Sequence, residues 1–268
     1  MFPRTGARGR EAAYADRMPL LSVCGIVTRY ADYRESDRII TLLTAEHGRL
    51  DAKARGCQRM GSALLPASQP FVYGRYELFY SRDKYTVNQC ELLETFYPLR
   101  EEYARFAAAS AALQLAHNAA QQDQPNEALF GLLYHALSFW AYGKADASDL
   151  LICYLIRYLD VCGYRPSVTR CAHCGRDVRA DALVRFDAKR GGAVCAACGG
   201  GTEISKTALE AMRRMLLLGD EEMGRVRLSA AIRRELLRCL PAYAAAATDH
   251  AVRALETLDI AALCADEM

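Results

Sequence analysis

The chain has 268 residues and a formal net charge of only +2, and this length can hold two modest domains with a hydrophobic core in each. It contains no run of about 18 uncharged apolar residues, which excludes a predicted membrane-spanning helix. Four arginines within the first 17 residues are not followed by an apolar run, which argues against a secretory signal. We therefore expect residues 1–19 to form a disordered leader.

Charge is distributed unevenly along the chain. Residues 1–85 hold 14 Lys and Arg against 9 Asp and Glu, residues 86–160 hold 4 against 9, and residues 161–205 hold 7 against 4. Two basic segments therefore flank an acidic middle. The pattern suggests a polyanionic partner for the basic segments and a protein partner or plain solvation for the acidic one, and chance is the alternative.

Residues 20–97 have the pattern of a small barrel. Strand-like stretches and one short helix follow one another at Leu20–Tyr30, Arg38–Thr44, Arg49–Arg55, Ser62–Leu65 (the helix), Phe71–Ser81 and Tyr85–Leu93. Five strands with a helix between the third and the fourth are typical of the OB-fold, a five-stranded β-barrel that binds single-stranded nucleic acid.

Residues 98–268 change to long helical patterns. Helices are predicted at Leu99–Gln121, Asn126–Tyr142, Ser148–Cys162, Lys206–Leu218, Ser229–Leu240 and Ala242–Leu258. Pro241 separates the last two in this prediction. The fold class is thus α+β multidomain, with a barrel domain at 20–97 and a helical domain at 98–268.

A four-cysteine segment interrupts the helical domain at 167–204. Cys171 and Cys174 form one CxxC pair, Cys195 and Cys198 form a second, and a glycine follows each pair. Two such pairs can close one tetrahedral site, so the sequence predicts one structural Zn²⁺ in an inserted zinc finger, since four thiolates leave no open position for catalysis.

Two other uses of the cysteines are less consistent with the sequence. A disulfide framework is disfavoured because the chain has eleven cysteines, an odd number, and no secretory signal, so a reducing cytoplasm fits better. A thioredoxin-like redox motif would need its CxxC at the start of a helix after a strand, whereas these pairs lie in loop sequence and occur twice.

The ordered motifs resemble one known family. They are Tyr33-Arg34-Glu35-Ser36-Asp37-Arg38-Ile39, Leu42-Leu43-Thr44 with Gly48-Arg49-Leu50, Ala54-Arg55-Gly56, Pro70-Phe71, and Gly163-Tyr164-Arg165-Pro166 leading into Cys171. Together they resemble the RecO family of bacterial recombination mediators, from residue 20 to about 260. The family combines an N-terminal OB-fold with a helical domain that in many members holds a four-cysteine zinc site.

The resemblance implies a non-enzymatic role in recombinational DNA repair. Such a protein binds single- and double-stranded DNA, anneals complementary strands and, with RecR, helps load RecA onto DNA coated by single-strand-binding protein. RecR, the C-terminal tail of single-strand-binding protein and, indirectly, RecA are the implied partners. The implied location is the cytoplasm, in association with the nucleoid. Arg213 and Arg214 are candidates for the rim of a tail-binding groove.

Basic residues on or between the predicted barrel strands are candidates to neutralise phosphates. They are Arg34, Arg38, Arg49, Lys53, Arg55, Arg59, Arg75, Arg82 and Lys84. By strand alternation Tyr73 and Phe79 share a side with Arg75 and could stack on bases, with internal packing as the alternative role. The opposite side, Val72, Tyr76, Leu78 and Tyr80, is predicted to be core.

One stretch departs from the family pattern. After Ala54-Arg55-Gly56 many relatives have a denser basic run, whereas this chain has Cys57-Gln58-Arg59-Met60. DNA binding by this loop is therefore expected to rest on fewer charges.

Two other classes of function were weighed. No histidine has a glutamate two residues on, which a zinc deaminase would need, and no P-loop or nucleophile elbow occurs. Thiol-disulfide catalysis through the cysteine pairs is the remaining enzymatic alternative. A zinc-ribbon RNA-binding or transcription-associated protein, in which the finger carries recognition, is the alternative among binding proteins.

Overall fold

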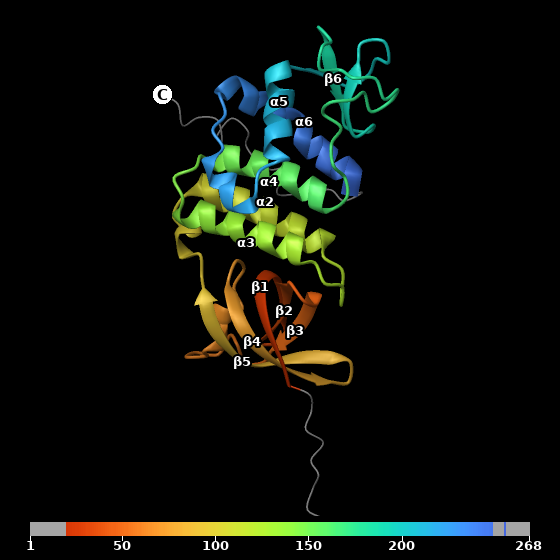
Figure 1. Ribbon diagram of the computed structural model, residues 1–268. Helices are drawn as coiled ribbons and strands as arrows, with labels where there is room; N and C mark the ends of the chain where they lie inside the picture. The colour runs from red at the N-terminus through yellow and green to blue at the C-terminus, as the bar shows by residue number, and fades with distance from the viewer. Residues whose placement is uncertain (1–19, 249–254, 256–268) are drawn as a thin grey trace, which may run out of the picture.

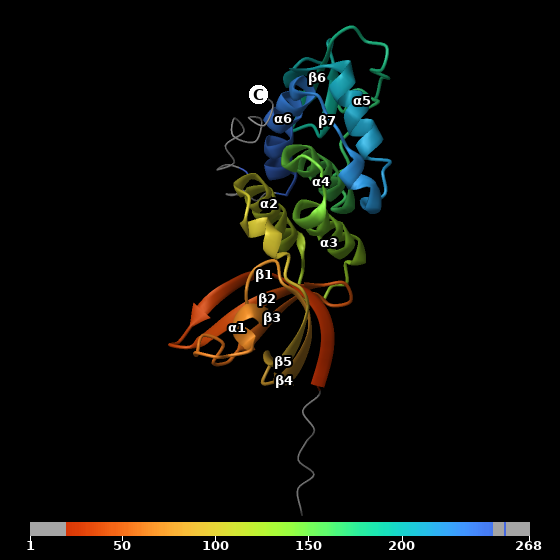
Figure 2. The same cartoon turned by 90° about the vertical axis from the view of Figure 1, so that its left-hand side faces the viewer.

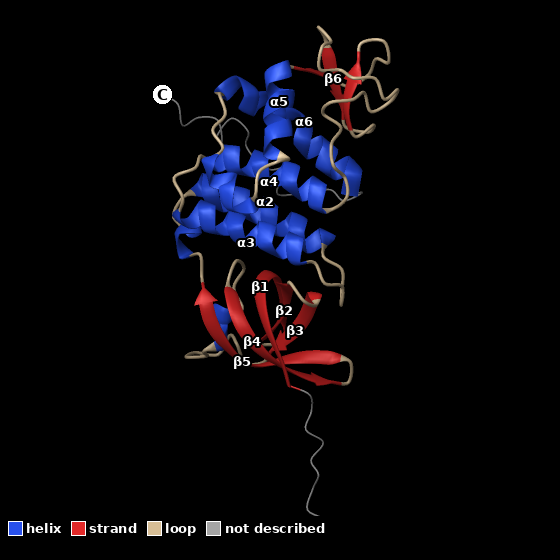
Figure 3. Cartoon of the chain, viewed as in Figure 1, coloured by secondary structure: helices blue, strands red, loops and turns tan. Residues whose placement is uncertain are grey.

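The computed structural model describes residues 20–248 and residue 255. The predicted leader at 1–19 lies outside these residues. A β-barrel occupies one end of the molecule, a helical bundle the middle, and a small three-stranded finger the other end (Figures 1 and 3). Within the described part, no helix is both long and apolar enough to cross a membrane.

The barrel confirms the predicted OB-fold layout. Its strands are β1 (Leu20–Tyr33), β2 (Asp37–Thr44), β3 (Gly48–Ala54), β4 (Tyr73–Ser81) and β5 (Lys84–Glu94), with the short helix α1 (Leu64–Ala67) between β3 and β4. They close in the order β1-β2-β3-β5-β4, and only the β3–β5 pair is parallel. The predicted helix begins and ends two residues later than expected.

Alternating side chains fill the barrel. On β4, Tyr76 and Leu78 are fully buried, and the Tyr76 hydroxyl donates a hydrogen bond of 2.7 Å to the Ala67 carbonyl of α1. Tyr80 was predicted to be core, but its side chain is 39% exposed. It lies one residue before the end of β4, where the barrel core no longer covers it, and its ring packs on Tyr85 instead.

The helical bundle follows a short 3-10 turn, η1 (Tyr97–Arg100). Its helices are α2 (Tyr103–Ala119), α3 (Glu127–Tyr142), α4 (Ala147–Val161), α5 (Lys206–Met215) and α6 (Ala230–Thr248), with the 3-10 helix η2 (Asp220–Arg225) between the last two. Helix α5 is therefore three residues shorter than predicted.

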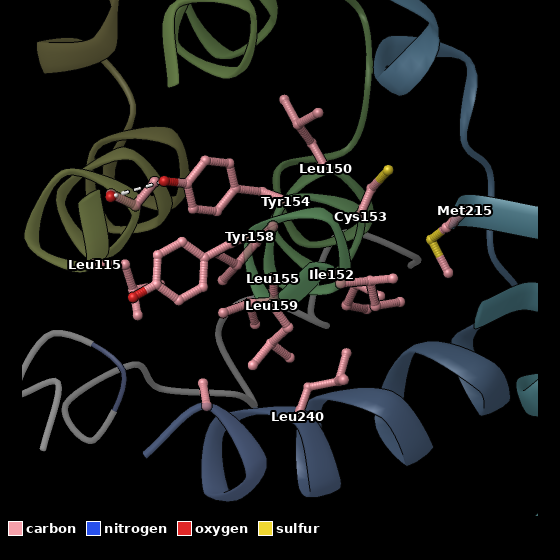
Figure 4. Packing of buried hydrophobic residues seen from close by; sticks show 14 of the residues in the cluster. Leu115, Leu150, Ile152, Cys153, Tyr154, Leu155, Tyr158, Leu159, Met215 and Leu240 are labelled. Atoms are coloured by element: carbon pink, nitrogen blue, oxygen red, sulfur yellow. Dashed lines mark hydrogen bonds between the residues drawn. The ribbon is translucent and has the colours of Figure 1, made fainter. Parts of the chain in front are cut away.

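Helix α4 is the centre of the bundle, and most of its side chains are buried. The Asp146 carboxylate caps it by accepting hydrogen bonds from the Ser148 and Asp149 amides. Tyr154 and Tyr158 point from α4 toward α2, and the Tyr154 hydroxyl donates to the Ala112 carbonyl at 3.1 Å (Figure 4).

The predicted break at Pro241 is wrong, because α6 runs through this residue as one helix. A proline inside a helix removes one backbone hydrogen bond and costs about 3 kcal/mol. Leu240, Tyr243 and Ala244 lie on both sides of it and are buried in the bundle core. Burial of this apolar face offsets the local cost. The rest of the second predicted helix, beyond Thr248, lies outside the described residues apart from Leu255.

The barrel and the bundle share a packed boundary. Leu43 and Ile26 of the barrel belong to the hydrophobic core of the bundle rather than to that of the barrel. The Tyr73 ring packs edge-on against Phe130 and Tyr134 of α3, with ring centroids 6.0 and 5.3 Å away. Figure 2 shows α2 and α3 directly above the barrel. This boundary covers part of the outer barrel surface.

Candidate nucleic-acid interface and metal centre

Four sulfurs gather in the finger. The Sγ atoms of Cys171, Cys174, Cys195 and Cys198 all lie within 4.8 Å of one another, so these residues could bind one metal ion. None of the cysteines in the described part forms a disulfide. The donor set fits a metal that prefers thiolates, and it supplies all four positions of a tetrahedral site.

Backbone turns build the two cysteine pairs. The Gly175 amide donates to the Cys171 carbonyl at 2.8 Å, and the Cys198 amide donates to the Cys195 carbonyl at 3.1 Å. The Cys195 amide donates to the Cys171 sulfur at 3.4 Å. Burial raises the pKa of the Cys171 thiol, but backbone amides of Cys174, Cys195 and His173 outweigh it and lower this pKa to about 6. These amides therefore favour the thiolate form of Cys171.

The finger contains a small sheet. Its strands β6 (Val184–Asp187), β7 (Gly192–Cys195) and β8 (Thr202–Ile204) form a sheet in the order β7-β6-β8. The Phe186 ring packs edge-on against Tyr243 of α6 at 5.6 Å, and the Tyr243 hydroxyl donates to the Tyr164 carbonyl at 2.8 Å. A metal in the finger would thus stabilise the connection between α4 and α5 against α6.

Four arginines of the finger pair with acids of the finger, whereas Arg170 and Lys189 make no ion pair with the described residues. Arg176 pairs with Asp181, Arg179 with Asp177, Arg190 with Asp187 and Arg185 with Glu203, at nitrogen–oxygen distances of 2.6, 2.5, 3.4 and 3.7 Å. Much of the positive charge of this segment is therefore compensated locally.

A second basic group lies on the barrel and differs in this respect. Arg34, Arg55 and Arg59 are exposed, and none makes an ion pair with the described residues. The Arg59 side chain lies over Gly56, and the Gln58 amide donates to the Ser36 carbonyl, so the loop after β3 lies against the β1–β2 turn. We call Arg34, Arg55, Arg59, Lys53 and Tyr33 the turn cluster.

Tyr33 is the aromatic residue of the turn cluster. Its side chain is 38% exposed, and the Lys53 ammonium and the Arg34 guanidinium lie 4.6 and 5.3 Å from its ring centre. Lys53 also pairs with Asp37 at 2.9 Å. An exposed ring among cations can stack on a nucleic-acid base while the cations contact phosphates. In the sequence, Tyr33 stands out only as the first residue of a family motif.

The Arg38 side chain lies on the opposite face of the sheet from Lys53, although the two residues are close in the barrel. It pairs in register with the buried Ala54, whereas Lys53 pairs with the exposed Ile39. The Arg38 guanidinium stacks 4.0 Å over Tyr30, pairs with Asp32 at 3.0 Å and donates to Ser68, which leaves 11% of its side chain exposed. These contacts favour a structural role at the end of the barrel.

The remaining candidates are spread over other parts of the barrel. Tyr73, Arg75 and Phe79 do alternate onto the outer side of β4, but Tyr73 is covered by α3, Arg75 pairs with Glu91 at 2.6 Å, and Phe79 is half-buried. Arg82 lies in the β4–β5 turn and Lys84 is the first residue of β5, which pairs with β3 through Lys53 and Thr86. Arg49 is half-buried near α2.

A groove in the helical domain has the properties expected for an acidic, apolar-ended peptide. It has a volume of about 940 Å³. Its apolar floor includes Leu209, Leu218, Val226 and Ile232, and its cations are Arg179, Lys206, Arg213, Arg214, Arg225 and Arg227, with Glu210 as the acid among its lining residues. Both Arg213 and Arg214 pair with Glu210.

Comparison with known proteins covers both domains. The family model described as Recombination protein O N terminal matches residues 18–96, and that described as Recombination protein O C terminal matches residues 100–256. The chain is 35% identical over 247 residues to DNA repair protein RecO of Symbiobacterium thermophilum, covering 90% of this chain and 98% of the relative. It is 35% identical over 230 residues to that of Pelotomaculum thermopropionicum, covering 84% and 88%. The barrel, the helical bundle and these similarities together confirm the resemblance, and the chain belongs to the RecO family of DNA repair proteins.

Proposed function

We propose that this protein is a non-enzymatic mediator of recombinational repair that binds single- and double-stranded DNA. The observation that carries the proposal is the turn cluster on the barrel. The Arg34 and Lys53 cations lie beside the exposed Tyr33 ring, and the exposed Arg55 and Arg59 follow in the loop after β3. Among the described residues, none of these three arginines makes an ion pair. Guanidinium groups in this state are available to neutralise phosphates and release counterions. Arg82 and Lys84, at the start of the strand that pairs with Lys53, are proposed to extend this surface.

Strand annealing follows from the same chemistry. Two complementary strands repel each other through their phosphates, and a protein that neutralises part of this charge lowers the barrier to their encounter. The test is annealing of two complementary oligonucleotides that carry a fluorophore pair, with and without single-strand-binding protein. Faster annealing in the presence of the protein supports the proposal, and an unchanged rate at DNA-saturating protein contradicts it.

The metal of the finger is proposed to be one structural Zn²⁺. Four thiolates in two CxxC turns are its preferred donors, and no fifth described group competes for the site. When bound, the ion supplies folding energy to a segment whose own core is small. Metal analysis of the purified protein, with one Zn²⁺ expected per chain, tests the identity of the ion.

The groove of the helical domain is proposed to hold the C-terminal tail of single-strand-binding protein. Lys206 and Arg227 make no ion pair with the described residues and can attract the acidic part of the tail, while the apolar floor takes its end. Lys206→Gln with Arg227→Gln should weaken binding of a fluorescent tail peptide. Arg234→Gln, which removes an exposed cation outside the groove, should not.

RecR is proposed as the second partner, so that the complex loads RecA onto DNA coated by single-strand-binding protein in the cytoplasm, in association with the nucleoid. A RecA filament-assembly assay on coated DNA tests this step. Filament growth should require both this protein and RecR. Growth that is equally fast without either protein would contradict the proposed role.

The zinc-ribbon alternative, in which the finger carries nucleic-acid recognition, is less favoured. Four of the five finger arginines already pair with Asp177, Asp181, Asp187 and Glu203. At these four, contact with a phosphate would have to replace an existing ion pair, which gains less than contact by a cation that has no ion pair. Comparing the salt dependence of single-strand binding in Arg55→Gln with Arg59→Gln and in Arg179→Gln with Arg190→Gln separates the two functions.

A further inference from the structure

A groove between the barrel and the helical bundle has no role in the function proposed above. It lies between the middle of β1, the segment Gln69–Phe71 and one face of α2, and its volume is about 760 Å³. We call it the junction groove. Its lining includes Arg29, Tyr30, Arg100, Phe106, Ser110, Gln114, His117 and Asn118.

The junction groove is cationic. Arg29 and Arg100 line it, and none of its lining residues is Asp or Glu. Hydrogen bonds to the Pro70 and Thr95 carbonyls, at 2.9 and 3.3 Å, hold the Arg100 guanidinium in place. Arg29 is exposed and makes no ion pair with the described residues. The charge of the groove is therefore complementary to an anion.

His117 reports the same positive field. Burial lowers its pKa first, and the cations Arg49 and Arg29 lower it further, against a smaller opposite effect of Asp51. The Thr28 hydroxyl lies 3.1 Å from His117 Nδ1 and fixes the ring at the floor of the groove. The ring is thus favoured in its neutral form, which can make hydrogen bonds without repelling Arg29 and Arg49.

Helix α2 contributes a ring and a row of polar groups to this groove. Phe106, Ser110, Gln114 and Asn118 recur at every fourth residue, so they share one face of the helix. The Phe106 ring is 42% exposed, and its centre lies 5.7 Å from that of Phe71 in an edge-on arrangement. Phe71 therefore supports Phe106 while part of the ring stays open to a ligand.

We propose that the junction groove seats one unpaired nucleotide of single-stranded DNA, with its base against Phe106 and its phosphate near Arg29. This inference rests on the proposed DNA-binding function and assigns it a second contact area. Aromatic stacking, amide groups and guanidinium cations are the chemistry by which proteins hold unpaired nucleotides. A base inside a duplex is stacked and paired, so it cannot reach Phe106, and the groove would favour single strands over duplex.

A fluorescent reporter in the groove tests the proposal in the full-length protein. Phe106→Trp places an indole where the base is expected, whereas Trp140, the chain's single Trp, is 1% exposed and gives a constant background. A thymidine oligonucleotide should quench the new signal, and an abasic oligonucleotide of equal length should not. Leu217→Trp, at an exposed position of the helical domain away from the groove, is the control and should show no base-dependent quenching.

A blocking variant tests the same contact without a reporter. Ser110→Trp should fill the groove and weaken single-strand binding roughly fivefold to 150-fold, the range expected for loss of one stacked base, with duplex affinity unchanged. An unchanged far-UV spectrum checks the fold. Equal losses for single strand and duplex, or equal quenching by the abasic strand, would overturn the proposal.

The outcome separates this inference from the function on which it rests. If Ser110→Trp binds single strands normally while Arg55→Gln with Arg59→Gln weakens binding, the groove assignment fails and the proposed function stands. If neither variant weakens binding, both fail.

Discussion

Arg55→Gln combined with Arg59→Gln is the most direct test of the turn cluster. Both side chains are exposed, neither makes an ion pair with the described residues, and the Gly56 turn holds them together. Glutamine keeps most of the length of each side chain and removes its charge. The substitutions therefore change phosphate neutralisation while leaving the barrel core untouched.

The expected magnitude follows from counterion release. Each phosphate contact to a single strand contributes about 0.7 to the slope of log affinity against log salt concentration. Loss of two contacts should reduce the magnitude of this slope by about 1.4. Relative to a reference of about 1 M salt, this change weakens binding about 25-fold at about 0.1 M salt. Fluorescence anisotropy of a labelled oligonucleotide at several salt concentrations measures both quantities.

A matched double variant controls for the loss of two positive charges. Arg179→Gln with Arg190→Gln removes the same charge from finger arginines that pair with Asp177 and Asp187. We expect a slope close to that of the parent protein. A normal slope in the barrel variant, together with a reduced slope in the finger variant, would refute the reasoning and favour the zinc-ribbon alternative.

Three further predictions concern stability. Removal of the finger metal by a chelator should lower the denaturation midpoint of the helical domain before it abolishes DNA binding, and loss of DNA affinity at unchanged far-UV circular dichroism would contradict a structural role. Arg233→Met should lower the free energy of unfolding by about 3–5 kcal/mol, because it leaves Asp149 as an uncompensated buried charge. The Asp149 side chain is 2% exposed and lies 2.9 Å from Arg233 Nε. A urea titration that shows a loss under about 1 kcal/mol would refute this prediction. The folded-state pKa of His117 is lowered, so its contribution to stability is complete above the unfolded value of about 6.5 and is lost as the pH falls below it. His117→Asn should therefore make the free energy of unfolding less dependent on pH between about 7 and 5, and equal pH slopes for the variant and the parent would argue against it.

The fold was largely predictable because its signals are local. The strand-like stretches of residues 20–97 and the alternation on β4 predicted strands that the structure confirms. The break at Pro241 was not predictable in this way, because the outcome depends on tertiary burial of Leu240 and Tyr243 on either side of it. Helix propensity is a weak guide where packing energy is larger.

The sequence predicted which residues of the barrel are basic, but not which of them are covered by the bundle or paired with a carboxylate. Strand alternation correctly placed Tyr73, Arg75 and Phe79 on one side of β4, but it could not tell which part of the outer barrel surface α3 would cover. It also could not tell a paired cation from an unpaired one. Arg75 and Arg55 are both candidates by sequence, yet of the two only Arg75 makes an ion pair with the described residues, to Glu91 on the neighbouring strand.

Pairing also changes the meaning of the acidic middle of the chain. Asp149 is neutralised by Arg233 from α6, Asp160 lies 3.3 and 3.7 Å from Arg165 and Arg157, and Glu91 pairs with Arg75. Part of this acidic excess therefore stabilises the fold through ion pairs instead of forming a surface for a positively charged partner. Arg34, Arg55 and Arg59 of the barrel make no ion pair with the described residues, so their charge is the part of the basic excess that is available for the proposed phosphate contacts.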